Sequence, residues 1–228
     1  MKSLKKTARL AGFLYLVGAI ASTYGLLYAP YQTTVGENSL ALAQKIVANE
    51  FLFRTKVVSN LIAAILFVLL VFALYRLFKN VNEHNAKLLV AFMVVQFPIT
   101  FVLETFQITA LMLLKGEIMN SLEPGQAQNL AMLFLDFYHC GIGILEICMG
   151  LWLLPFGQLV YRSGFIPRIL GVFLIIGGIA YIVDSFTFLL FPGYKAIVSK
   201  YAVVFWALAE FPIMLWLLIK GVKEQNPQ

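Results

Sequence analysis

The stretch NLAMLFLDFYHCGIGILEICMGLWLL, residues 129–154, decides the fold class, because it is long and apolar enough to cross a bilayer yet contains an Asp, a His and a Glu. An α-helix turns about 100° per residue, so Asp136, His139 and Glu146 fall on one stripe of such a helix. Ionisable groups are expensive inside a bilayer and usually mark a site. The stretch therefore predicts a membrane helix with one polar face.

The composition excludes a soluble protein. Apolar residues make up 61% of the 228 residues and charged residues only 12%, whereas a soluble domain usually carries about 25% charged residues. The mean hydropathy is +0.86. The formal net charge is +6, and the basic residues gather at the ends of apolar runs, which suits anionic lipid headgroups. We therefore expect membrane lipids as partners and no nucleic acid.

Six apolar runs reach the length that a bilayer demands, about 17–25 residues. The predicted spans are residues 8–28, 57–78, 88–114, 129–154, 169–191 and 201–219. Backbone polar groups in lipid must pair within their own segment, so each span is expected to be an α-helix. We predict an all-α, polytopic fold in which residues 1–228 form a single domain, a bundle of six transmembrane helices. A short helix from Asn38 or Ser39 to about Phe53 is expected in the first outer loop, either lying in the membrane interface or packed as a loop helix without a function of its own.

The distribution of Lys and Arg predicts the orientation. If the N-terminus is cytoplasmic, eleven basic residues lie on the cytoplasmic side and six on the outer side. We therefore expect a multi-pass protein of the cell membrane with both termini in the cytoplasm. Arg162 and Arg168 lie in a cytoplasmic loop of this arrangement, where they would contact lipid phosphate and help to fix the orientation.

Five carboxylates fall inside the predicted spans, and three further polar side chains accompany them. The candidates for a ligand pocket are Glu104, Asp136, His139, Asp184, Glu210, Asn60 and Gln107. Counted from the span midpoints, several of these side chains share a depth nearer the outer face, whereas Glu146 falls toward the inner side and is expected to be structural. No Lys or Arg is expected at this depth. Such a pocket needs a cation, which is a proton, a metal ion, an organic cation or protonated His139.

Cofactor motifs are absent from the sequence. With a single His in a span, a haem held by two histidines and a zinc held by three are excluded. Cys140 and Cys148 lie about 12 Å apart along one helix, too far for a disulfide, and no Cys/His pattern indicates structural zinc. No nucleotide-binding motif occurs either. If a metal binds, His139 and Asp136 are the candidate ligands.

Several phrases resemble a known family. They are LFLDFYH (residues 133–139), LVYRSGFIPRILG (159–171), YIVDSF (181–186), FPGY (191–194) and the ending from Glu210 to Val222. Together they resemble the bacterial domain of unknown function 4386 family. The resemblance implies a six-span protein of the bacterial inner membrane and no particular activity. It draws attention to Asp136, His139, Arg162, Arg168, Asp184 and Glu210, which stand inside the matching phrases.

Three functions remain open at this stage. The first is a membrane protein whose acidic pocket binds or moves a small cationic ligand, an ion or a proton. The second is an intramembrane enzyme that uses His139 and carboxylates on a lipid-like substrate. The third is a structural or accessory subunit whose polar groups hold helices together by hydrogen bonds. A homo-oligomer is compatible with each of them. We favour the first function over an enzyme.

Overall fold

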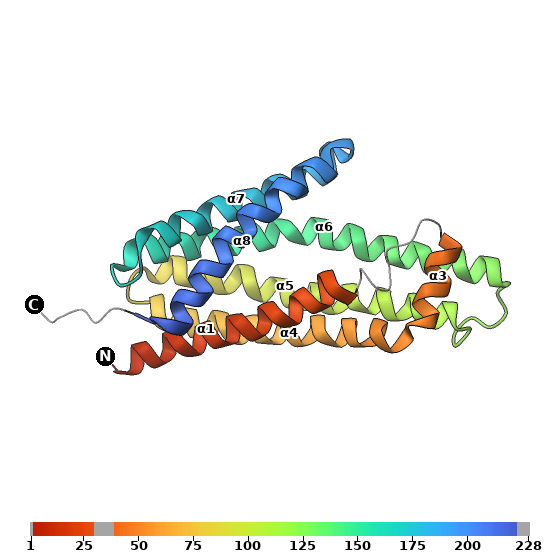
Figure 1. The fold of residues 1–228 in the computed structure, drawn as a ribbon, viewed down its shortest axis with the longest axis horizontal. Helices are drawn as coiled ribbons and strands as arrows, with labels where there is room; N and C mark the ends of the chain where they lie inside the picture. Colours follow the sequence, from red (N-terminus) through yellow and green to blue (C-terminus); the bar gives the residue numbers. More distant parts are fainter. Residues whose placement is uncertain (1, 30–38, 223–228) are drawn as a thin grey trace, which may run out of the picture. The chain divides into compact units, whose positions relative to one another are not determined.

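The computed structural model describes residues 2–29 and 39–222, and within these residues every regular element is helical (Figure 1). The elements in chain order are α1 (Lys2–Thr23), the π-helical turn η1 (Tyr24–Tyr28), α3 (Ser39–Ala48), α4 (Glu50–Phe78), α5 (Glu83–Leu114), α6 (Pro124–Ser163), α7 (Arg168–Leu190), the 3-10 turn η2 (Pro192–Tyr194) and α8 (Lys195–Ile219). Six of the described helical segments are long and apolar enough to cross a membrane. This confirms the predicted all-α fold with six spans.

The helix in the first connection is confirmed, although it is shorter than predicted. It begins at Ser39 and ends at Ala48 instead of near Phe53, because α4 begins at Glu50, seven residues before the predicted span. The side chain of Asn49 donates a hydrogen bond to the carbonyl of Lys45 at 2.9 Å and closes the end of α3. Asn38, the alternative first residue of this helix, lies outside the described residues.

Helix α6 is much longer than the span predicted over residues 129–154. It has 40 residues, which corresponds to about 60 Å, or twice the thickness of a hydrocarbon core. Pro124 occupies the first position, where its missing N–H costs nothing. The helix ends at Ser163, because Gly164 follows with a φ of 70°, a conformation that glycine adopts readily. A large part of α6 must therefore lie outside the hydrocarbon.

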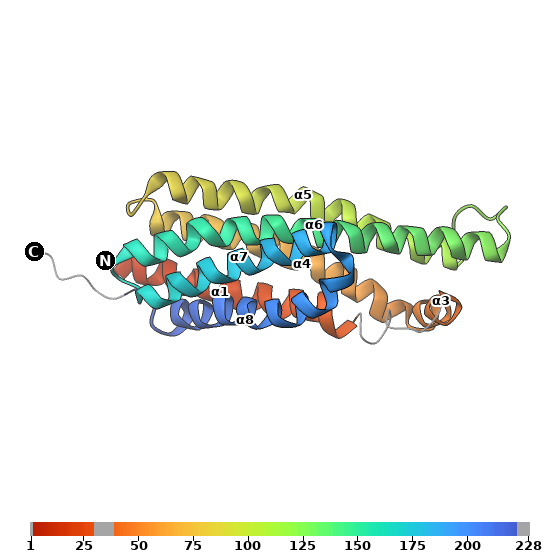
Figure 2. The ribbon, with the colours of Figure 1, turned by 90° about the horizontal axis from the view of Figure 1, so that it is seen from above.

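The chain divides into two compact units, and the first comprises residues 1–17, 66–97 and 143–228. Glycines allow α7 and the part of α6 that belongs to this unit, residues 143–163, to pack closely side by side (Figure 2). A Cβ atom on Gly157 would lie 2.7 Å from the carbonyl oxygen of Gly171, and Gly150 meets Gly178 in the same way. Small residues at such positions are the usual means by which membrane helices approach each other.

The second unit comprises residues 18–65 and 98–142. Helix α3 packs in it against the beginning of α4, the end of α5 and the beginning of α6. The buried apolar residues of this core include Ile46, Phe53, Leu111 and Leu135. Every one of these four helical segments thus has an apolar face that is covered, which holds the polar side chains described next in fixed positions.

Candidate functional site

Five polar side chains from α4, α5 and α6 form a buried group in the second unit, which we call the Glu104 centre. Its members are Lys56, Asn60, Glu104, Gln107 and Tyr138, and none of them is more than 5% exposed. Residues three or four apart lie on the same face of a helix, which explains how α4 presents Lys56 with Asn60 and α5 presents Glu104 with Gln107. The structure thus brings three of the predicted pocket residues together.

The carboxylate of Glu104 is held by two amides. The Nδ2 atom of Asn60 donates a hydrogen bond to Oε1 at 2.7 Å, and the Nε2 atom of Gln107 donates one to Oε2 at 2.6 Å. Within the described part of the chain, three buried oxygens of this centre form no hydrogen bond of good geometry: Asn60 Oδ1, Gln107 Oε1 and Tyr138 Oη, although Tyr138 lies close enough to Asn60 and Gln107 to interact with both. A buried polar atom without a partner costs about 1–3 kcal/mol, so three in one group call for an explanation.

Lys56 brings a positive charge into this group. Its Nζ atom lies 4.7 Å from the ring centroid of Phe53 and 5.3 Å from that of Tyr138. Among the described residues it forms no salt bridge, although it interacts electrostatically with Glu104. The prediction that no Lys lies at the depth of the carboxylates is therefore wrong. It failed because α4 begins at Glu50, so that Lys56 belongs to the helix rather than to a loop.

The π-helical turn η1 covers one side of the Glu104 centre. A Cβ atom added at Gly25 would overlap Asn60 Oδ1, so glycine is required there. Two hydrogen bonds fix the segment around this turn on α4: Tyr24 Oη with Thr55 Oγ1 at 2.8 Å, and Ser59 Oγ to the carbonyl of Ala21 at 2.9 Å. Single π-helical turns occur frequently at functional sites.

Asp136 and His139 are exposed and lie at the edge of the Glu104 centre, whereas Tyr138 faces inward. The ring of His139 has its centroid 5.6 Å from that of Tyr138, and His139 interacts electrostatically with Lys56 and Asp136. The length of α6 explains the difference from the prediction. Asp136 precedes Arg162 at the basic end of α6 by 26 residues, about 40 Å along the axis, which exceeds the roughly 30 Å of a hydrocarbon core. These two side chains are therefore expected at the level of the lipid headgroups. Within the described residues, no three His, Cys, Asp or Glu side chains are grouped to hold a metal ion.

Asp184 lies in the first unit, in a group that we call the Lys195 clamp. The Nζ atom of Lys195 donates to Asp184 Oδ2 at 2.7 Å and to Glu146 Oε2 at 2.9 Å. The hydroxyl of Ser199 donates to Asp184 Oδ1 at 2.8 Å. One ammonium thus serves two carboxylates. Lys195 is a second lysine beside the carboxylates, although it falls between the predicted spans 169–191 and 201–219 and was therefore expected in a loop.

Glu146 lies farther from the basic end of α6 than predicted. It precedes Arg162 by sixteen residues, and Asp184 follows Arg168 by sixteen residues. Both carboxylates therefore lie about 24 Å from the basic ends of their helices. The prediction placed Glu146 toward the opposite side because it took Leu154 as the end of the span, whereas α6 continues to Ser163.

Glu210 forms a third group, also in the first unit. Both of its oxygens accept hydrogen bonds from phenols, from Tyr15 at 2.8 Å and from Tyr181 at 2.9 Å. The ring of Tyr181 stacks on Trp206 with centroids 4.3 Å apart. Three helices, α1, α7 and α8, are joined by this group, and its carboxylate is fully paired. A structural role in holding these helices together accounts for it.

Arg162 and Arg168 flank the connection between α6 and α7, and both are exposed. The guanidinium of Arg168 lies over the ring of Tyr161, 5.6 Å from its centroid. These positions leave both arginines accessible to lipid phosphate, the partner expected from the sequence.

Comparison with known proteins gives a family and a relative that matches part of the chain. The family described as Domain of unknown function (DUF4386) matches residues 10–221. A protein from Archaeoglobus fulgidus, described as an uncharacterized protein, is 36% identical over 77 residues, which is 34% of this chain and 44% of that protein. The chain thus spans less than half of the length of this relative. No solved structure matches the chain.

Proposed function

This chain belongs to the family described as Domain of unknown function (DUF4386), and we propose that it binds a small monovalent cation at the Glu104 centre in exchange for a proton carried by Lys56. The observation that carries the proposal is the set of three unpaired buried oxygens beside a single carboxylate. When a monovalent cation replaces the proton of Lys56, the net charge of the buried group stays the same.

The chemistry of the donors selects the class of ligand. Apart from the amine nitrogen of deprotonated Lys56, the atoms that the Glu104 centre offers to a cation are oxygens: a carboxylate, two amide oxygens and a phenol. Oxygen donors suit hard cations such as the alkali ions. Since Glu104 is the one carboxylate of this centre, a monovalent ion balances the charge, whereas a divalent ion leaves an uncompensated positive charge in a buried place.

Lys56 sets the condition for binding. With its ammonium charged, Lys56 already balances Glu104, and a second cation would be repelled. A lysine loses its proton readily when it is buried. Binding of an alkali ion to Glu104 therefore requires that Lys56 release its proton, which couples one ion to one proton.

The test is the affinity for sodium and potassium as a function of pH. The apparent Kd of detergent-purified protein is measured by the shift in thermal unfolding, with choline chloride holding the ionic strength constant. If one proton is released for each ion bound, the apparent Kd falls about tenfold for each unit by which the pH is raised between pH 6 and 8. Lys56→Gln is expected to bind with no dependence on pH, because the proton to be released is gone.

Two carboxylate variants serve as test and control. Glu104→Gln keeps the size of the side chain and is expected to lose the response to both ions. Asp136→Asn removes an exposed carboxylate from the same unit and is expected to respond as the wild type does. An equal ion response in wild type and Glu104→Gln would refute the proposal, as would a pH dependence that persists in Lys56→Gln.

We further propose that the protein resides in the cell membrane with both termini in the cytoplasm. The support is the excess of Lys and Arg, eleven against six, on the side of the termini. In this orientation the Glu104 centre lies toward the outer face, because Glu104 follows Glu83 at the start of α5 by 21 residues, about 32 Å of helix. The site would then exchange its ion with the outer medium.

A further inference from the structure

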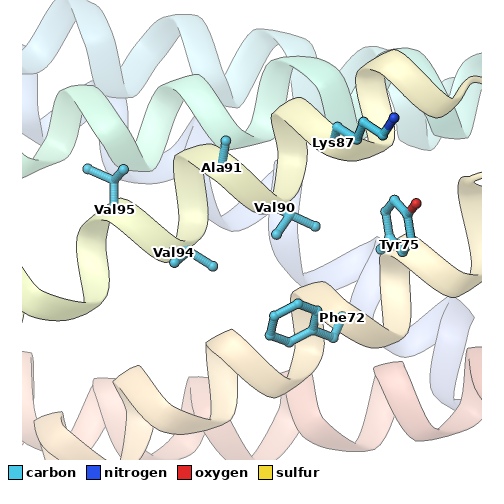
Figure 3. A pocket seen from close by; sticks show the side chains of 7 residues that line it. All are labelled: Phe72, Tyr75, Lys87, Val90, Ala91, Val94 and Val95. Carbon is cyan, nitrogen blue, oxygen red and sulfur yellow. The ribbon is translucent and has the colours of Figure 1, made fainter.

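A groove between α4 and α5 in the first unit has no part in the Glu104 centre. Its volume is about 570 Å³, within the range of pockets that hold small ligands. The α4 side is formed by Phe72 and Tyr75, and the α5 side by Lys87, Val90, Val94 and Val95 (Figure 3). We call it the α4–α5 groove. Most of its lining is apolar.

The polar residues of the groove lie together at one end. Tyr75 lies one turn before the end of α4 at Phe78, and Lys87 lies one turn after the start of α5 at Glu83. Both polar tips are at the same end in Figure 3, and they interact electrostatically. The valines follow along α5 in the direction of the membrane centre. The groove thus changes from polar to apolar in the same direction as a phospholipid does.

The charge at this end is positive. Arg76, Lys79 and Lys87 lie at or beside the connection between α4 and α5, against one carboxylate, Glu83, which gives a local charge of 3 − 1 = +2. Glu83 accepts one hydrogen bond from Lys87 Nζ at 2.9 Å. An ammonium has three donors, so two remain for another anion. Anionic lipids are attracted to such basic positions at the membrane surface.

We propose that the α4–α5 groove binds one anionic glycerophospholipid. One acyl chain lies along Phe72, Val90 and Val94, and the phosphate accepts hydrogen bonds from Lys87 and from the hydroxyl of Tyr75. This inference is independent of the proposed cation exchange, since it uses other residues and another ligand.

The experiment compares two lipids of opposite headgroup character. Thermal unfolding of the detergent-purified protein is measured with added phosphatidylglycerol or phosphatidylcholine of the same acyl chains. At saturation, phosphatidylglycerol is expected to raise the Tm by about 5–10 °C, and phosphatidylcholine by less than half as much. Lys87→Gln is expected to remove the difference between the two lipids. Ala91→Phe fills the groove from its exposed rim and is expected to remove the response to both.

Two matched controls lie on α8. Lys200→Gln removes an exposed lysine, and Val203→Phe adds a ring to an exposed apolar position, in each case away from the groove. Both are expected to respond to phosphatidylglycerol as the wild type does. Equal stabilisation of the wild type by the two lipids would overturn the proposal. A loss of the response in Lys200→Gln as large as that in Lys87→Gln would do so as well, because it would indicate general attraction to a basic protein.

Discussion

At the scale of single residues, the Glu104 centre depends on which side chains contact one another across α4, α5 and α6. Asn60, Glu104 and Gln107 were recognisable from the sequence as polar residues in apolar spans. Lys56 was not, because hydropathy placed it before the span, although it stands four residues before Asn60 and hence on the same helix face. That spacing was the available signal. Whether a side chain meets a partner depends on how each helix is rotated, which hydropathy does not report.

Gly25 provides the test of how tightly the Glu104 centre is built. A Cβ at this position overlaps Asn60 Oδ1, so Gly25→Ala must displace the amide that holds Glu104. Overpacking of this kind costs about 1–3 kcal/mol, and the Tm is expected to fall by roughly 2–10 °C. The weakened hold on Glu104 should also reduce the sodium affinity. Both quantities are measured in detergent solution.

Gly125→Ala is the matched control, because nothing lies within 4 Å of a Cβ at Gly125. Its Tm and its ion affinity are expected to equal those of the wild type. If Gly25→Ala were as stable as Gly125→Ala, the contact between η1 and Asn60 would not constrain the centre.

At the scale of helices, the sequence located the apolar part of each span well and its ends poorly. A hydropathy window detects the residues that face lipid, but a helix continues as long as its backbone bonds are satisfied, in lipid or in water. The polar turns at the start of α4 and at both ends of α6 therefore escaped prediction. The misplaced ends shifted the apparent depths of Glu146 and Asp136 relative to the other carboxylates.

The beginning of α4 and the end of α5 are joined by charges. Lys115, which follows the end of α5, contacts Glu50 at 2.9 Å and also pairs with Glu117, and Arg54 contacts the same two carboxylates. The hydrogen bonds that Lys115 Nζ donates to Glu117 and Glu50 raise the pKa of Lys115 above its ordinary value. The pKa is higher in the folded state, so the stabilisation is complete below the unfolded pKa of about 10.4. It disappears as the pH rises through the folded value.

Lys115→Gln is therefore expected to lower the Tm slightly at neutral pH and low salt, and the loss should shrink at high salt because exposed charges are screened. The difference between variant and wild type should shrink as the pH rises through the folded pKa of Lys115, because the wild-type lysine then also becomes neutral. Lys200→Gln, an exposed lysine outside this group, is expected to show none of these changes. A salt-independent loss in Lys115→Gln would mean that packing, not charge, accounts for it. Thermal unfolding at varied salt and pH measures the loss in Tm and its dependence on salt and on pH.

At the scale of the whole molecule, the all-α fold with six spans followed from composition alone, since only helices satisfy the backbone in such segments. The arrangement of the buried polar residues could not be predicted from the sequence in this way. From the sequence, the buried carboxylates were predicted to share one acidic pocket without a Lys or Arg. In the structure, Glu104 lies in the Glu104 centre, Asp184 in the Lys195 clamp and Glu210 in the Glu210 group. A lysine accompanies two of these three. In those two groups the balancing charge comes from a lysine near the beginning of a helix, where hydropathy assigns a loop, whereas Glu210 is paired by the phenols of Tyr15 and Tyr181.

The proposed orientation makes a prediction for the intact protein. A fluorescent reporter that folds only in the cytoplasm is expected to be active when fused after Gln228, at the C-terminus. A phosphatase that folds only outside is expected to be active when inserted after Gly125, before the long apolar part of α6. The reverse pattern would place the Glu104 centre toward the cytoplasm, and the proposed exchange would then face the other compartment.

The Lys195 clamp also bears on how the chain enters the bilayer during synthesis. Asp184 and Lys195 are eleven residues apart and belong to the consecutive helices α7 and α8, so their charges can neutralise each other within one helical hairpin as it leaves the ribosome. A buried carboxylate that waited for a distant partner would oppose its own insertion. The two helices are thus suited to enter as a pair, with the earlier Glu146 joining once α6 is in place. The last two spans thus neutralise a buried carboxylate with a lysine of their own helical hairpin.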